Sequence, residues 1–225
     1  MLYYLYKKER AAAIFRRRKD MRILIISDTH GQLDRFWDVF YRLQKEAPVD
    51  TIVHCGDHYR DAEEIRMRCG LPVLAVPGNC DGDHDEESFA LLETEAGDFL
   101  VTHGHMLDVG HDLSRLYYKT LEAGCTGAFF GHTHRSVYLN MDGVHLLNPG
   151  SLPRPRDGLG GTFAVVETGP ESVQATIYRY ASFMGEGGDQ DGGDNGGGGK
   201  GSEGGDKPAV KGGRLRRLLN YSDRF

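Results

Sequence analysis

Five short polar motifs recur along the chain, and each directly follows an apolar run. They are Asp28-Thr29-His30, Gly56-Asp57, Gly78-Asn79-Cys80-Asp81, His103-Gly104-His105 and Gly131-His132-Thr133-His134. Imidazole nitrogens with carboxylate and amide oxygens, and no thiolate pair, suit Mn, Fe, Zn or Ni rather than calcium. One such motif alone is more often a turn or a structural histidine than a ligand pair, but five in one chain favour a metal centre. Two His-x-His pairs plus two aspartates exceed what one ion can use, so the set indicates two ions.

The elements before these motifs have to bring them together. Apolar runs at 23–26, 51–54 and 73–76 predict strands, with helical periodicity over 36–43 and 62–67 between them. This alternation predicts a parallel sheet with right-handed crossovers. Further strands are predicted at 89–92, 99–102, 128–130, 137–139, 144–147, 163–166 and 173–178, with a helix over 111–122 and a hairpin turn at 141–143.

Parallel units followed by antiparallel hairpins predict two packed mixed sheets with helices outside. Ligands bind at the carboxyl ends of strands in open α/β sheets, so we expect the five motifs to meet at one sheet edge. Glycines at 56, 78, 104 and 131 are expected to let the backbone turn sharply beside the site.

Composition divides the 225 residues into four parts. Residues 1–20 are a basic N-terminal extension with a net charge of +5, and residues 21–180 form one domain with a net charge of −11. Fourteen of the 31 glycines lie between Gly185 and Gly213, which predicts a disordered linker over 181–213 before a basic C-terminal segment, 214–225. For the extension three interpretations stay open: a start at Met21, a disordered arm, or a basic anchor for anionic lipid. Either tail could contact an unknown partner.

The same composition excludes several classes of protein. The acidic domain argues against a protein that coats nucleic acid, which needs a basic surface. No apolar run approaches the ~20 residues of a membrane span. The four cysteines contain no Cys-x-x-Cys pair, so we expect reduced thiols and a cytoplasmic location.

In this order, the motifs DTH, GD, GNCD, THGH and GHTH resemble those of the calcineurin-like metallophosphoesterase superfamily. The short length, GNCD in place of GNHD, and Asn148-Pro149-Gly150-Ser151 are similar to the small YfcE-like phosphodiesterase branch. The resemblance covers residues 21–180. It implies a four-layer αββα sandwich of two mixed β-sheets flanked by helices, with a dinuclear metal centre at the sheet edge.

The resemblance also implies a ligand set. The first ion would be held by Asp28, His30, Asp57 and His134, and the second by Asp57, Asn79, His103 and His132. Asp57 would bridge two divalent ions, with manganese the first choice and zinc, iron or nickel as alternatives. A hydroxide that bridges the ions would attack the phosphorus in line, without a protein nucleophile.

The residues expected to act in catalysis are Asp57, Asn79, Cys80, Asp81 and His105. Cys80 stands where larger members of the superfamily have a proton-donating histidine, and Asp81 is expected to orient a group at that position. Cysteine is a poorer acid near neutral pH, which favours substrates whose leaving group departs unaided. His105 could contact substrate. Arg154 and Arg156 either meet a substrate phosphate or belong to a rigid proline loop.

The predicted function is therefore a dinuclear-metal-dependent phosphodiesterase that hydrolyses a small phosphodiester or nucleotide-like substrate, in a chain that could also form a homo-oligomer. A phosphomonoesterase is the alternative enzyme. The alternative from another class is a protein-interaction scaffold, like the related subunit of the retromer coat. Loss of ligands, particularly at the positions of His30 and His132, would mark a scaffold, and all seven ligand positions are intact.

Overall fold

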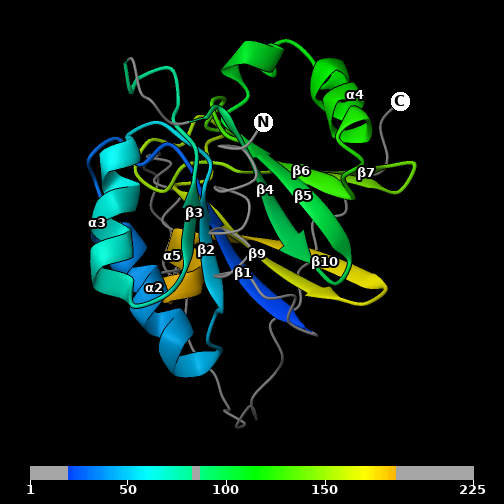
Figure 1. The fold of residues 1–225 in the computed structure, drawn as a ribbon. Helices are drawn as coiled ribbons and strands as arrows, with labels where there is room; N and C mark the ends of the chain where they lie inside the picture. Colours follow the sequence, from blue (N-terminus) through cyan, green and yellow to red (C-terminus); the bar gives the residue numbers. More distant parts are fainter. Residues whose placement is uncertain (1–19, 83–86, 186–225) are drawn as a thin grey trace, which may run out of the picture. The chain divides into compact units, whose positions relative to one another are not determined.

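The computed structural model describes residues 20–82 and 87–185 (Figure 1). Strands β1 (Met21–Ile26), β2 (Thr51–His54) and β3 (Val73–Ala75) are parallel, as the sequence predicts. Strands β9 (Thr162–Gly169) and β10 (Ser172–Arg179) extend this sheet in antiparallel fashion beyond β1, giving the order β10-β9-β1-β2-β3. We call it the first sheet.

The second sheet has the order β4-β5-β6-β8-β7. Its strands are β4 (Phe89–Thr94), β5 (Gly97–Thr102), β6 (Gly127–Phe129), β7 (Ser136–Met141) and β8 (Val144–Pro149). The predicted hairpin joins β7 to β8, and both turn residues, Asp142 and Gly143, have positive φ. Strands β5, β6 and β8 pair in parallel, so the second sheet is mixed, as predicted, and helix α4 (Ser114–Glu122) connects β5 to β6.

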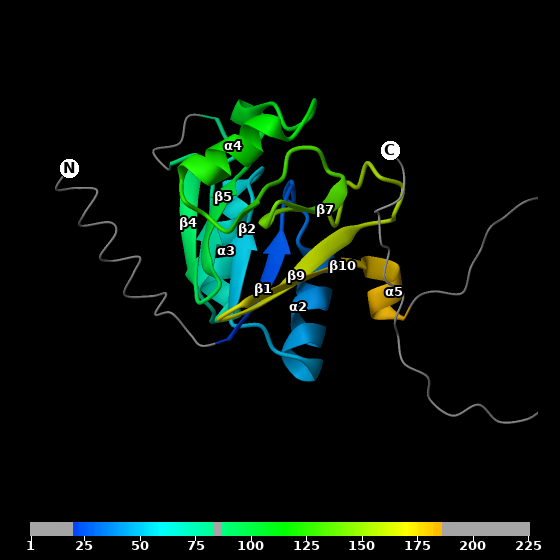
Figure 2. The same cartoon turned by 90° about the vertical axis from the view of Figure 1, so that its right-hand side faces the viewer.

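The layers follow the order helix, sheet, sheet, helix (Figures 1 and 2). Helices α2 (Asp34–Glu46), α3 (Tyr59–Cys69) and α5 (Tyr180–Met184) cover the outer face of the first sheet, and α4 lies on the outer face of the second. A short 3₁₀ helix, η1 (His105–Leu107), follows β5. The predicted four-layer αββα sandwich of two mixed sheets is confirmed.

Burial on both faces explains why the strands appear as unbroken apolar runs. Along β1, Leu24 and Ile26 pack against the helices of the first sheet, while Ile23 and Ile25 pack against the second sheet. Successive side chains of a strand point to opposite faces, so a strand between two packed layers needs an apolar residue at every position.

The folded chain runs past the boundary that the glycine content suggests at residue 180. Helix α5 continues to Met184, and the Phe183 ring lies 5.0 Å from Phe163 and 5.5 Å from Tyr178. The packing of the Phe183 ring on the core explains why the fold includes residues 181–185, although small residues surround that ring in the sequence. The predictions for 1–19 and 186–225 lie outside the described residues. Within the described part of the chain, no helix is long and apolar enough to cross a membrane.

Candidate metal centre

The five polar motifs lie at the carboxyl ends of parallel strands from both sheets. Asp28, Asp57 and Asn79 follow β1, β2 and β3 of the first sheet, whereas His103 and His132 follow β5 and β6 of the second. The motifs converge, as expected from strand ends, but they come from two sheets rather than from the edge of one.

The glycines beside the site serve two different purposes. Gly56 and Gly104 have φ of +97° and +98°, so they make the expected sharp turns. Gly78 and Gly131 do not have positive φ and instead permit close packing. A Cβ atom on Gly78 would lie 2.1 Å from Asp57 Oδ1, and one on Gly131 would lie 1.9 Å from Ser27 Oγ.

A first group of side chains converges closely enough to hold one metal ion. One donor atom from each of Asp28, His30, Asp57 and His134 lies within 4.8 Å of all the others. His134 Nε2 is 3.2 Å from Asp28 Oδ1 and 3.3 Å from His30 Nε2. His30 Nε2 in turn lies 3.6 Å from Asp57 Oδ2. These are the four residues of the predicted first site.

A second group gathers on the other oxygen of the same aspartate. His103 Nε2 is 3.2 Å from Asp57 Oδ1 and 3.1 Å from Asn79 Oδ1. His132 Nδ1 is 2.9 Å from Asn79 Oδ1. Asp57 therefore presents Oδ2 to the first group and Oδ1 to the second, and every predicted ligand lies in one of the two groups.

Backbone carbonyls orient two of the imidazoles. His134 Nδ1 donates to Arg154 O at 2.7 Å, and His103 Nδ1 donates to Cys55 O at 2.8 Å. A carbonyl only accepts, so the proton of each neutral ring sits on Nδ1 and the Nε2 lone pair faces the site. Both rings are thus held in the tautomer that a metal ligand needs.

The donor atoms fit a divalent cation. Asp28 is fully buried, and its Oδ1 accepts no hydrogen bond within the described structure. Its neighbour at 3.2 Å is His134 Nε2, which presents a lone pair once Nδ1 carries the proton. Two electron-pair donors that face each other in a buried place are stabilised by a cation between them. Mixed nitrogen and oxygen donors suit a transition metal or zinc.

The electrostatics keep three of these groups, His30, His132 and Asp57, in ligating form. Burial lowers the pKa of His30 and of His132, which favours neutral rings. For Asp57, burial would raise the pKa, but His103 and the backbone N–H of Cys80 outweigh burial and lower it. The Asp28 carboxylate raises the pKa of His134 against the effect of burial. A cation bound between Asp28 and His134 would contact both the carboxylate and the imidazole ring.

Most of the ligands sit in left-handed backbone conformation. Asp28, His30, Asp57, His132 and His134 have φ between 47° and 70°. Residues with a Cβ atom rarely adopt this region, and it costs roughly 1–3 kcal/mol per residue where it occurs. Such conformations concentrate at functional sites, where the surrounding structure maintains them.

Cys80 and Asp81 make backbone contacts that the sequence pattern does not indicate. The backbone N–H of Cys80 donates to Asp57 Oδ1 at 3.0 Å, while burial and the nearby Asp57 raise the pKa of its exposed thiol to about 11. Both oxygens of Asp81 accept backbone N–H groups, from Tyr59 at 2.6 Å and Gly78 at 2.7 Å. Asp81 thus ties the loop after β3 to the start of α3. Both oxygens already hold the loop in place, so the role of Asp81 in orienting an imidazole at position 80 stays a prediction.

His105 lies beside the second group. Its ring centroid is 5.4 Å from that of His103 and 6.3 Å from that of His132. Its Nδ1 is buried and has no hydrogen-bond partner among the described residues. The position of the ring beside the second group is compatible with the predicted contact with substrate, which stays a prediction.

Sequence reasoning missed a polar network behind the first group. His54, fully buried, lies with Nε2 2.9 Å from Thr29 Oγ1, which donates to Asp61 Oδ2 at 2.6 Å. The Gly31 N–H also donates to Asp61 Oδ2, at 2.8 Å. The network fixes the loop that carries Asp28 and His30. Asp61 is one of three acids in α3, with Glu63 and Glu64, so in the structure only its burial distinguishes it.

The remaining histidines stay outside the two groups. His58 pairs with Asp61 at 3.2 Å, His145 lies 2.7 Å from the Tyr138 hydroxyl, and exposed His111 lies beside Asp112. His84 lies outside the described residues.

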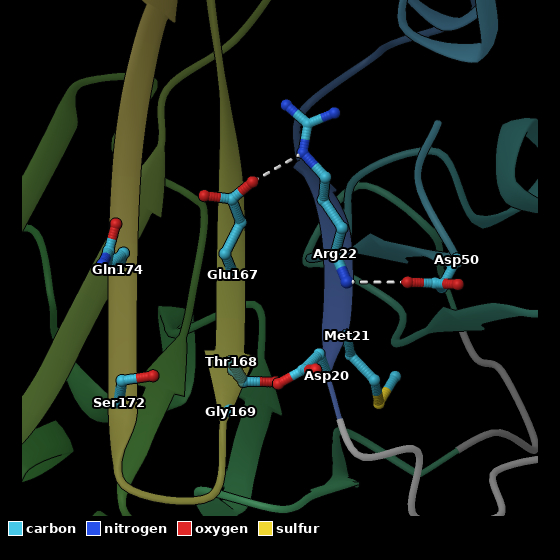
Figure 3. Close-up of a pocket in the computed structure, with 9 residues that line it drawn as sticks. All are labelled: Asp20, Met21, Arg22, Asp50, Glu167, Thr168, Gly169, Ser172 and Gln174. Atoms are coloured by element: carbon cyan, nitrogen blue, oxygen red, sulfur yellow. Dashed lines mark hydrogen bonds and ion pairs between the residues drawn. The ribbon is translucent and has the colours of Figure 1, made fainter. Parts of the chain in front are cut away.

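A separate pocket opens at the opposite end of β1 (Figure 3). It has a volume of about 300 Å³ and is lined by Asp20, Met21, Arg22, Asp50, Glu167, Thr168, Gly169, Ser172 and Gln174. Arg22 spans it, with Nε donating to Glu167 and its backbone N–H donating to Asp50. It holds none of the predicted ligands and lies at the amino end of β1, away from the sheet edge where ligands are expected.

Comparison with known proteins agrees with this geometry. The profile of the calcineurin-like phosphoesterase superfamily domain matches residues 21–171. A probable metallophosphoesterase of Bacillus subtilis is 32% identical over 161 residues, which make up 72% of this chain and 92% of the relative. A phosphodiesterase of Methanocaldococcus jannaschii is 28% identical over 150 residues, 58% of this chain and 83% of the relative.

Solved structures show the same fold. A predicted phosphoesterase from Streptococcus pneumoniae superposes with a TM-score of 0.61 at 23% sequence identity, covering 72% of this chain and 91% of the other. With a family profile over two thirds of its length and a relative matched almost from end to end, this chain belongs to the calcineurin-like phosphoesterase superfamily.

Proposed function

We propose that the protein is a phosphodiesterase that uses two divalent metal ions to hydrolyse a small phosphodiester or a nucleotide-like substrate. The observation that carries this proposal is the division of Asp57, with Oδ2 near His30 and Oδ1 near His103. A carboxylate shared between two ligand groups is the arrangement that joins ions about 3.5–4 Å apart. Similarity to a relative that is named a phosphodiesterase supports the choice of diesters as the substrate class.

Each ion would have four protein ligands. Asp28, His30, Asp57 and His134 would hold the first, and Asp57, Asn79, His103 and His132 the second. When bound, the ions would supply charge stabilisation to the phosphoryl oxygens and lower the pKa of coordinated water. Asn79 adds a ligand oxygen without a negative charge, so two carboxylates serve two dications and the site stays positive enough for an anionic ester.

The residues around the second group limit which leaving groups depart easily. The thiol of Cys80, with a pKa of about 11, holds its proton too tightly to be an effective acid at neutral pH. The His105 ring lies next to His103, and burial lowers its pKa, so at neutral pH it is mostly uncharged. We therefore expect aryl diesters to react faster than alkyl diesters.

The test is hydrolysis of bis(p-nitrophenyl) phosphate and p-nitrophenyl phosphate after chelation and metal add-back, with the metal content of each sample measured. We expect no turnover in the metal-free protein, recovery with manganese ahead of zinc, and preference for the diester. A His111→Ala variant, changed at an exposed histidine outside both ligand groups, is the matched control and should behave as wild type. Full activity without metal would contradict the proposal. Preference for the monoester would support a phosphomonoesterase instead.

We also propose a cytoplasmic location, supported by the cysteines. All four are free, and two of them, Cys55 and Cys125, are buried. Unpaired thiols suit a reducing compartment.

A further inference from the structure

We propose that Arg154 and Arg156 form an anion-binding arm beside the first ligand group, which selects phosphoesters that carry a second anionic group next to the reacting phosphate. The inference rests on the proposed function and narrows its substrate class. The two side chains belong to the segment 151–157, between β8 and β9.

The backbone of this segment is fastened to the ligands themselves. Arg154 O accepts from His134 Nδ1 at 2.7 Å, and the Arg156 N–H donates to His134 O at 2.9 Å. The Arg154 N–H donates to Ser151 Oγ, which donates to Asp28 O at 2.9 Å. Pro153 and Pro155 restrict the chain further, because the proline ring fixes φ. Both arginines thus start from fixed points at the edge of the first group.

Their guanidinium groups are available to a ligand. Both residues are exposed, and neither forms an ion pair within the described part of the chain. The neighbouring acid, Asp157, is occupied: Oδ2 accepts from the Ser136 N–H and hydroxyl, and Oδ1 accepts from the Leu159 N–H. Two unpaired cations beside the site contrast with a domain whose net charge over 21–180 is −11.

The positive charges of Arg154 and Arg156 affect the pKa values of two histidines of the first group. Burial is the main reason that the pKa of His30 is lowered, and the charge of Arg154 adds to the effect. Arg156 opposes the rise in the pKa of His134 that Asp28 causes. This agrees with the backbone contacts, in which both Arg154 and Arg156 hydrogen-bond His134.

The chemistry of guanidinium defines the ligand class. Its planar array of N–H donors matches phosphate and carboxylate, often through two parallel hydrogen bonds. The reacting phosphate of a diester carries one negative charge, which the metal ions would already offset. Two additional cations are matched by a further anionic group, such as the second phosphate of a nucleotide.

Kinetics with two matched substrates test the proposal. Thymidine 5′-(p-nitrophenyl phosphate) and its 3′-phosphorylated form share the reacting bond and differ in one phosphate. For wild type we expect a lower KM for the 3′-phosphorylated substrate. Arg154→Ala/Arg156→Ala should raise that KM roughly tenfold, leave kcat and bound metal unchanged, and barely affect the other substrate. Arg115→Ala, which removes an exposed arginine on α4, is the matched control.

Binding gives an independent measurement. By calorimetry, pyrophosphate should bind the metal-loaded wild type more tightly than phosphate does, and the double variant should lose roughly tenfold in pyrophosphate affinity. If the double variant raises KM equally for both nucleotide substrates, the arginines bind the reacting phosphate. If it raises neither KM, they bind no part of the substrate. Either result contradicts the proposed anion-binding arm. If wild type hydrolyses neither substrate, the proposed function fails, and the pyrophosphate comparison still decides the arm.

Discussion

Acidification should destabilise the fold through His54, the buried imidazole behind the ligand loop. Its ring is fully buried, Nδ1 accepts the Gly56 N–H at 3.2 Å, and Nε2 lies beside Thr29 Oγ1. A second proton would have to displace the Gly56 N–H from Nδ1. Burial accordingly lowers the pKa of His54 from 6.5 to about 4.

The magnitude follows from this difference. Between pH 4 and 6.5 the unfolded chain binds a proton at His54 that the folded chain does not, so the stabilisation is complete above pH 6.5 and is lost as the pH falls. Each pKa unit corresponds to about 1.4 kcal/mol. His54 should therefore remove about 3 kcal/mol from the free energy of unfolding between pH 7 and pH 4.

Urea unfolding of wild type and His54→Gln, at pH 7, 6, 5 and 4 in the presence of a chelator, measures this contribution. Glutamine cannot titrate, so the variant should be less stable at pH 7 but lose about 3 kcal/mol less than wild type on acidification. His111→Gln, at an exposed position, should follow wild type. Parallel pH profiles for wild type and His54→Gln would refute the assignment of this loss to His54.

Three further changes have defined outcomes. Asp57→Asn should lower metal occupancy in both ligand groups and reduce turnover more than His132→Ala does; metal analysis that finds two ions per chain in the asparagine variant would exclude the bridge. Removal of 186–225 should leave turnover unchanged, whereas removal of 181–225 deletes Phe183 and should cost about 1–2 kcal/mol in urea unfolding. Cys80→His should speed alkyl diesters by less than about tenfold, because Asp81 is engaged with Tyr59 and Gly78; a gain in the range of 10²–10⁴ would mean that the new imidazole acts as a general acid without Asp81.

The sequence contained enough to predict the layers and the convergence of the candidate ligand residues. Residues 23–26 of β1 are covered on both faces and are all apolar, so a short uninterrupted run marked the strand and the polar motif after it. The ligands directly follow the ends of such strands, which made their convergence predictable before any contact was known.

The remaining interactions of the site have no signature in the sequence. The ties from His134 to Arg154 and from His103 to Cys55 use carbonyl oxygens, which every residue has. The role of Asp81 depends on an N–H group 22 positions earlier in the chain, at Tyr59. The parallel pairing of β5, β6 and β8 likewise joins separate strands in a register that a local pattern of apolar residues does not encode.

Because the ligands come from both sheets, a bound ion would act as a clasp between two halves of the sandwich. Asp28 and His134 follow strands of different sheets, as do Asn79 and His103, so each ion would cross-link the halves at the same open edge. Apolar packing holds the sheets together in the middle of the sandwich, and the metal ions would hold them together at the edge that carries the ligands. Chelation should therefore loosen the molecule from this edge inward, with hydrogen exchange rising first in the loops after β1 and β6.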